Sequence, residues 1–158
     1  MERIWAPWRM EYIAGDDSDE CFLCRSISES CDPKNLLLKR GQDCGIIMNR
    51  YPYTNGHVLV FPYRHVRMMS EMGKSERLEM MDLIDESLET LRATMTPDGF
   101  NIGYNLGKTA GAGLEDHIHA HIVPRWNGDT NFMPVLGDVR VIPQSLTALY
   151  EQLKPLFV

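Results

Sequence analysis

The sequence has no apolar run long enough to cross a membrane, and its start lacks the apolar core of a signal peptide. Basic residues are outnumbered, with 16 Lys and Arg against 22 Asp and Glu, and the net charge of −6 disfavours nonspecific nucleic-acid binding, which needs a basic face. Without a secretion signal, the four cysteines are expected to be thiols. We therefore expect a cytoplasmic protein with neither a membrane nor a nucleic-acid partner.

The 158 residues are expected to form a single domain, because this length suits one domain with one core. A content of 44% hydrophobic and 24% charged residues argues against disorder. Residues 1–20 contain Trp5 and Trp8 and then an acidic stretch, so we interpret them as an arm that packs its aromatic residues on the domain. Residues 124–158 are interpreted as a C-terminal tail.

The spacing of apolar residues predicts an α+β fold. We expect strands at 44–50, 57–62, 100–105, 117–123 and near 139–142, and helices at 75–95 and near 144–154. Ser75 is the expected N-cap of the long helix. The first two strands are expected to pair antiparallel through a turn at 51–56. The fold class is thus an antiparallel sheet of about five strands with one long helix and a C-terminal helix. The residues expected on the buried face of the long helix are Leu78, Met81, Ile84, Leu88, Leu91 and Met95.

Three of the five histidines alternate with apolar residues in one pentapeptide, His117-Ile118-His119-Ala120-His121. Side chains alternate between the faces of a strand, so the three histidines share one face and the residues between them face the core. A buried core has little use for such a row, because each ring nitrogen needs a partner. The row therefore predicts either a metal site or nucleophilic and acid–base catalysis.

Cys21-Phe-Leu-Cys24 has the spacing of a zinc knuckle, which supplies half of a tetrahedral site. His65 and His117 are the natural donors to complete it. Such a Cys2His2 set is a closed, structural site with no open position for substrate. The alternatives are a thioredoxin-type redox pair, which the surrounding acidic loop disfavours, and a His65 that is only a surface residue beside two arginines.

The segment from 105 to 113 precedes the three histidines and contains Gly107, Gly111 and Gly113. Glycine-rich loops let backbone N–H groups approach a phosphate closely. The loop lacks the Gly-Lys-Ser/Thr order of a Walker motif. Directly before three histidines, it indicates chemistry in which an imidazole attacks phosphorus, forms a phosphoramidate and is then displaced.

Residues 117–123 match the pattern His-φ-His-φ-His-φ-φ, and on this motif the chain resembles the histidine triad (HIT) superfamily. Asn49 resembles the ribose-binding position of the family, His57 its additional active-site histidine, and Asn105 its phosphate-proximal amide. His65 resembles the histidine that joins a C-x2-C pair in zinc-bearing members.

The resemblance implies a nucleotidyl hydrolase or transferase acting on the α-phosphate of a nucleotide substrate. His119 would be the nucleophile, and His121 and His57 would orient it and the phosphate. His117 would be a ligand of one structural zinc per chain, together with Cys21, Cys24 and His65. Members of the family are usually homodimers that pair their long helices and extend the sheet.

The segments 5–9 and 124–132 resemble the branch of diadenosine tetraphosphate phosphorylases, which pass the nucleotidyl group to inorganic phosphate. In that branch Trp126 would stack on a purine and Arg125 would meet a phosphate; the alternative is that Trp126 only covers the sheet edge. Ala112-Gly113 stands where many members carry Gln or Ser. His121 stands where galactose-1-phosphate uridylyltransferases carry Gln, which argues against sugar-nucleotide exchange.

The expected activity is therefore cleavage of dinucleoside polyphosphates through a covalent nucleotidyl-histidine, with phosphate as acceptor. Three alternatives stay open. One is hydrolysis of adenosine phosphoramidates, and another is nucleotide binding with little turnover. In the third the triad itself holds a catalytic zinc, which the other available ligands disfavour.

Overall fold

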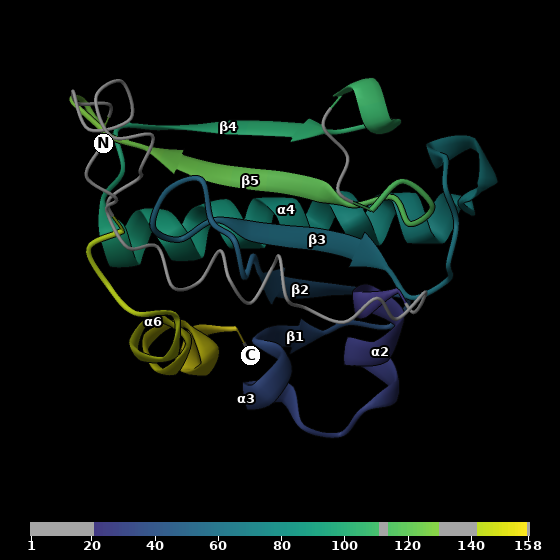
Figure 1. Ribbon diagram of the computed structural model, residues 1–158, viewed down its shortest axis with the longest axis horizontal. Helices are drawn as coiled ribbons and strands as arrows, with labels where there is room; N and C mark the ends of the chain where they lie inside the picture. Colours follow the sequence, from purple (N-terminus) through teal and green to yellow (C-terminus); the bar gives the residue numbers. More distant parts are fainter. Residues whose placement is uncertain (1–20, 111–113, 130–141, 158) are drawn as a thin grey trace, which may run out of the picture.

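The computed structural model describes residues 21–110, 114–129 and 142–157, in which a five-stranded sheet lies on one long helix (Figure 1). The strands are β1 (Leu37–Arg40), β2 (Cys44–Met48), β3 (Val58–Pro62), β4 (Gly99–Tyr104) and β5 (Ala120–Arg125). The helices are α2 (Phe22–Ser28), α3 (Asp32–Asn35), α4 (Lys74–Met95) and α6 (Leu146–Leu153), with 3-10 turns η1 (Met69–Glu71), η2 (Lys108–Ala110) and η3 (Lys154–Leu156). The expected α+β class with one long helix and a C-terminal helix is confirmed.

The sheet has the order β1-β2-β3-β5-β4, and every pair is antiparallel. The predicted pairing of the segments 44–50 and 57–62 is confirmed as β2 with β3. Gly56 in the turn between them has a φ of +79°, and a Cβ there would lie 2.7 Å from the Met95 sulfur. Glycine is thus required both by the backbone conformation and by the close approach of α4.

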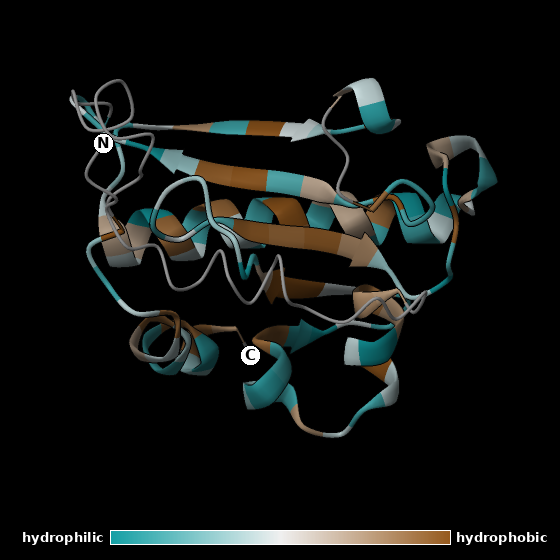
Figure 2. Ribbon diagram, in the orientation of Figure 1, coloured by the Kyte–Doolittle hydropathy of each residue, from teal (hydrophilic) through white to brown (hydrophobic). Residues whose placement is uncertain are grey.

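The two faces of the sheet carry different layers. One face packs on α4 and α6 through the main core, whose members include Ile46, Val58, Val60, Ile122, Met80, Leu91 and Leu149. The opposite face carries a smaller cluster in which Leu23 of α2 covers strand residues, namely Leu37, Ile47, Leu59 and Phe61. Strands β2 and β3, which lie between these two layers, are accordingly buried along their length (Figure 2). His121 pairs in register with Leu59, so the triad faces the α2 side.

The long helix differs from the prediction at its start and in its buried face. Gly73 is its N-cap, two residues before the predicted Ser75, because the Glu76 carboxylate accepts the Gly73 N–H at 2.6 Å and closes the first turn there. Leu78 and Met81 are 65% and 54% exposed, so their assignment to the core was wrong. The predicted Ile84 and Leu91 are buried, and the face that meets the sheet is completed by Met80, Leu83 and Ser87.

Several boundaries and short elements also differ. Strand β5 begins at Ala120, so His117 and His119 precede it, because the Ile118 N–H bonds to the Val66 carbonyl outside the strand ladder. The fifth strand is β1, which the sequence did not reveal. The expected strand near 139–142 falls almost wholly outside the described residues, and residue 142 is not in a strand. The arm 1–20, with Trp5 and Trp8, also lies outside them.

Within the described ranges, no helix has the length and apolar character needed to span a membrane.

Candidate active site and metal centre

The three triad histidines lie side by side on the α2 face of the sheet, at the start of β5. His117 is fully buried, His119 is buried and His121 is half-buried. The ring centroids of His119 and His121 are 4.9 Å apart. The alternate residues Ile118 and Ala120 join the main core, as the alternation predicted.

The hydrogen bonding of His119 leaves one ring nitrogen available. Its Nδ1 lies 2.8 Å from the His117 carbonyl oxygen, which can only accept, so the proton is on Nδ1. The lone pair is therefore on Nε2. Burial lowers the pKa of His119, although its bond to the His117 carbonyl opposes this, so the ring is neutral at pH 7. A neutral imidazole with an unprotonated Nε2 is suited to nucleophilic attack.

His121 is held in the opposite tautomer by a chain of donors. The Tyr53 N–H donates to His57 Nδ1 at 3.1 Å, which places the His57 proton on Nε2. His57 Nε2 in turn lies 3.0 Å from His121 Nδ1, so the His121 proton is on its own Nε2. That nitrogen lies 3.4 Å from Asn105 Nδ2, and the amide accepts the Nε2 proton only when it is flipped so that its Oδ1 faces His121. Burial lowers the pKa of His121 to about 4, so this ring is also neutral and offers an N–H donor.

The turn before β3 supports the buried His57. The Asn49 Oδ1 accepts the Tyr51 N–H at 2.9 Å, and its Nδ2 lies 3.3 Å from His57 Nδ1. The Tyr53 ring lies 4.6 Å from the His57 ring and stacks on His121 at 5.9 Å. Sequence reasoning missed Tyr53. Its position in the turn before His57 was the indication in the sequence that this aromatic ring belongs to the site.

The glycine-rich loop is described only in part. Gly107, two residues after Asn105, has a φ of +83°, and the turn η2 follows it. Gly111 and Gly113, which we predicted to approach phosphate, lie outside the described residues, as does the departure at Ala112. The described part places Asn105 next to the imidazole of His121.

The predicted metal ligands lie together at the other end of the triad. The ligand atoms of Cys21, Cys24, His65 and His117 all lie within 4.8 Å of one another. The Sγ of Cys21 lies 3.2 Å from His117 Nδ1, and the Sγ of Cys24 lies 3.2 Å from His65 Nδ1 and 3.5 Å from His117 Nδ1. The sequence had indicated a loop for both cysteines, and this was wrong. Cys21 is the N-cap of α2 and Cys24 lies in its first turn.

This geometry fits a tetrahedral metal ion. Metal–sulfur and metal–nitrogen bonds of about 2.3 and 2.0 Å give ligand–ligand separations of roughly 3.5 Å in a tetrahedron. His117 Nε2 lies 2.7 Å from the Pro62 carbonyl and donates to it, so Nδ1 keeps its lone pair for a metal. Burial lowers the pKa of His117 to about 4, which also keeps the ring deprotonated. These four residues could hold a metal ion.

Arg125 and Trp126 do not join the triad in the described residues. Four residues of strand, about 13 Å, separate His121 from Arg125. The Arg125 guanidinium binds Asp129 and lies 2.7 Å from the Asn101 side-chain oxygen. The Trp126 indole N–H donates to the Met95 carbonyl at 3.3 Å, at the end of α4. Their predicted contacts with a nucleotide therefore remain predictions from the sequence.

Comparison with known proteins gives one family. A model of the HIT domain matches residues 32–128. AP-4-A phosphorylase of Mycobacterium tuberculosis is 35% identical over 154 residues, which cover 92% of this chain and 79% of the relative. Adenosine 5'-monophosphoramidase of Schizosaccharomyces pombe is 26% identical over 102 residues, covering 65% and 73%. The crystal structure of a zinc-bound histidine triad family protein from Mycobacterium smegmatis superposes with a TM-score of 0.68 at 26% identity, covering 87% of this chain and 92% of that one. With the triad on one sheet face and the family match over most of its length, the chain belongs to the HIT family.

Proposed function

We propose that the protein cleaves dinucleoside polyphosphates of the diadenosine tetraphosphate type at an α-phosphate, and passes the nucleotidyl group to inorganic phosphate. The observation that carries the proposal is the hydrogen bonding of the two rings, from which we infer a lone pair on His119 Nε2 and an N–H on His121 Nε2. The similarity to AP-4-A phosphorylase over 92% of this chain supports this substrate class and phosphate as acceptor.

In the proposed reaction, His119 Nε2 attacks the α-phosphorus and forms a P–N bond. The bond from that phosphorus to its bridging oxygen breaks, and the remaining nucleotide leaves with the electron pair. His121 Nε2–H donates to a phosphate oxygen, and His57 holds His121 in the required tautomer. An oxygen of inorganic phosphate then attacks the same phosphorus, the P–N bond breaks, and a nucleoside diphosphate is released.

The binding residues are proposed from their positions around this pair. Asn105 and Gly107 would contact the phosphate, together with Gly111 and Gly113 of the same loop. Asn49 would contact the ribose, because it stands at the turn beside His57.

We also propose that the metal is one structural zinc ion per chain, held by the cluster of Cys21, Cys24, His65 and His117. Two thiolates and two imidazoles are a usual ligand set for zinc, and they leave no open position for substrate. When bound, the ion would cross-link α2 to the segments that carry His65 and His117.

None of the four cysteines forms a disulfide. A reducing compartment preserves thiolate ligands, and we place the protein in the cytoplasm on this ground, which cell fractionation would check.

A product assay tests the function. With diadenosine tetraphosphate as substrate, we expect ADP and ATP to appear only when inorganic phosphate is present. Release of AMP without phosphate would make water the acceptor. No turnover of this substrate, with turnover of an adenosine phosphoramidate, would favour the second candidate activity, which the similarity to the Schizosaccharomyces pombe enzyme supports. Tight nucleotide binding without any product would indicate a binding role.

We propose that a second copy of the chain covers the outer edge of β4 and the adjoining face of α4. Ile102 on β4 is 47% exposed, and its pairing with Ile122 places it on the face of the sheet that carries α4. The exposed Leu78 and Met81 lie on α4. A groove joins the two elements, and its lining residues are Met69, Met72, Arg77, Met80, Met81 and Tyr104. Pairing of two such edges would extend the sheet and bury this apolar surface.

We expect light scattering to give a mass twice the chain mass of 18.1 kDa. Ile102→Lys should shift the protein to monomer, because a charge at a paired edge opposes association. The matched control is Leu156→Lys, at a residue that is equally exposed (48%) but lies on η3. A monomeric parent protein, or a dimer that Ile102→Lys leaves intact, would exclude this interface.

A further inference from the structure

The helix that carries both candidate thiolate ligands is very short. Helix α2 has seven residues, and a helix of this length is not stable in water without tertiary contacts. Its buried side chains are Leu23, which packs on the sheet, and Ser26, whose hydroxyl bonds to the Leu23 carbonyl. The position of Cys21 and Cys24 therefore depends on what holds the two ends of α2.

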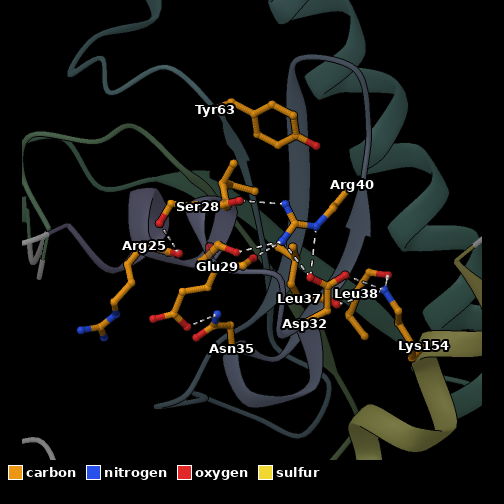
Figure 3. Close-up of polar contacts among 12 residues, drawn as sticks. Arg25, Ser28, Glu29, Asp32, Asn35, Leu37, Leu38, Arg40, Tyr63 and Lys154 are labelled. Carbon is orange, nitrogen blue, oxygen red and sulfur yellow. Dashed lines mark hydrogen bonds and ion pairs between the residues drawn. The ribbon is translucent and has the colours of Figure 1, made fainter.

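A single side chain from the sheet holds the C-terminal end. Arg40, the last residue of β1, donates from Nη1 to the Ile27 carbonyl at 2.9 Å and from Nη2 to the Glu29 and Ser26 carbonyls at 2.7 and 3.2 Å. These are the carbonyls that a helix end leaves without partners, and a cation is favourable there. Figure 3 shows the Arg40 guanidinium between the end of α2 and Asp32.

Asp32 fixes the guanidinium in this position. Its Oδ1 accepts from Arg40 Nε at 3.1 Å and from Nη2 at 2.8 Å. Lys154 approaches the other oxygen of Asp32 at 3.4 Å and donates to the Leu38 carbonyl at 3.0 Å, but among the described residues none of its hydrogen bonds reaches α2. Arg40 thus links the sheet to the C-terminal end of α2 through hydrogen bonds, whereas Lys154 links the sheet to the C-terminal segment.

We propose that Arg40 is a positioning residue for the metal centre: by holding the C-terminal end of α2 against β1, it places Cys21 and Cys24 opposite His65 and His117 before the metal binds. Cys24 lies three residues, about 4.5 Å along the helix axis, from Ile27, whose carbonyl Arg40 binds. A rotation or fraying of α2 would move both sulfur atoms. The metal would then have to order the helix as it binds, which weakens binding. The inference rests on the metal site proposed above.

The test is metal affinity in the full-length protein, with Arg40→Met compared with Lys154→Met. Zinc affinity is measured by competition with a chromogenic chelator, and Co²⁺ serves as a spectroscopic probe of the ligand set. We expect Arg40→Met to weaken zinc binding by about 10- to 100-fold, the range for residues that support metal ligands. Its Co²⁺ spectrum should keep the bands of a tetrahedral site with two thiolates, because all four ligands remain. Lys154→Met should stay within about twofold of the parent, although it removes a cation from the same network.

Amide hydrogen exchange of the metal-free protein gives a second readout. The Arg25 N–H donates to the Cys21 carbonyl and the Glu29 N–H to the Arg25 carbonyl, each at 3.0 Å. In Arg40→Met these amides should exchange faster than in the parent and in Lys154→Met, while amides of α4 stay unchanged. If Arg40→Met does not fold, Arg40→Lys is measured instead, since it keeps the charge but loses the forked geometry.

Three results would overturn the proposal. Unchanged zinc affinity in Arg40→Met would show that α2 needs no such support. Equal weakening in Lys154→Met would show that the loss reflects general destabilisation. A parent protein that binds neither zinc nor Co²⁺ would remove the metal site itself. That last outcome is separate from the nucleotidyl reaction, which the product assay tests.

Discussion

His119→Asn is expected to lower turnover of diadenosine tetraphosphate by about 10⁴-fold or more, because removal of a covalent nucleophile has effects of this size. The asparagine amide can still donate to the His117 carbonyl, as His119 Nδ1 does at 2.8 Å, so the local backbone should be preserved. No other ring in the site can replace the lost lone pair, since His121 Nε2 carries a proton. The measurement is the rate of nucleotide release under saturating substrate.

The matched control is His121→Asn, which keeps the nucleophile and removes only the N–H donor. We expect a smaller loss of about 10²- to 10⁴-fold, and we expect mass spectrometry of rapidly quenched enzyme to show a nucleotidyl adduct in this variant and none in His119→Asn. Zinc content should be the same in both variants, because neither residue belongs to the Cys2His2 cluster. An active His119→Asn enzyme, or an adduct on another residue, would refute the assignment.

The triad and the cysteine pair of the metal cluster could be predicted because both are local patterns. Because histidine alternates with Ile118 and Ala120, the three histidines are expected on one face of an extended segment. The structure has this shared face even though β5 begins only at Ala120. The spacing of Cys21 and Cys24 suits metal binding within one helical turn as well as in a loop, so the four predicted ligands lie together although the predicted local structure was wrong.

What the sequence did not reveal depends on contacts between distant segments. Strand β1 has four residues, too few for a periodic pattern, and only its pairing with β2 defines it. Leu78 and Met81 fit a helical stripe, but the sheet meets the helix on a neighbouring face. Arg40 shows no local pattern at all, because its partners at the end of α2 lie 11 to 14 residues away in the chain.

Cys24→Ser is expected to remove the metal and to destabilise the protein strongly. The Cys24 sulfur contacts both imidazole ligands, at 3.2 Å from His65 Nδ1 and 3.5 Å from His117 Nδ1, and a serine hydroxyl is a poor ligand for zinc. At a zinc concentration 1,000 times the dissociation constant, the parent gains about 4 kcal/mol from binding, and the variant loses this gain. The thermal midpoint should fall by roughly 10 °C.

Cys31→Ser is the matched control, because Cys31 is exposed and lies outside the ligand cluster, so zinc content and thermal midpoint should stay at the parent values. Equal zinc content in the Cys24 and Cys31 variants, or no metal in parent protein prepared without chelators, would contradict the zinc assignment.

At temperatures where the Cys24 variant remains folded, its turnover should fall far less than that of His119→Asn. The reason is that His117 is also held by its bond to the Pro62 carbonyl, and it is the His117 backbone, rather than the metal, that fixes the tautomer of His119.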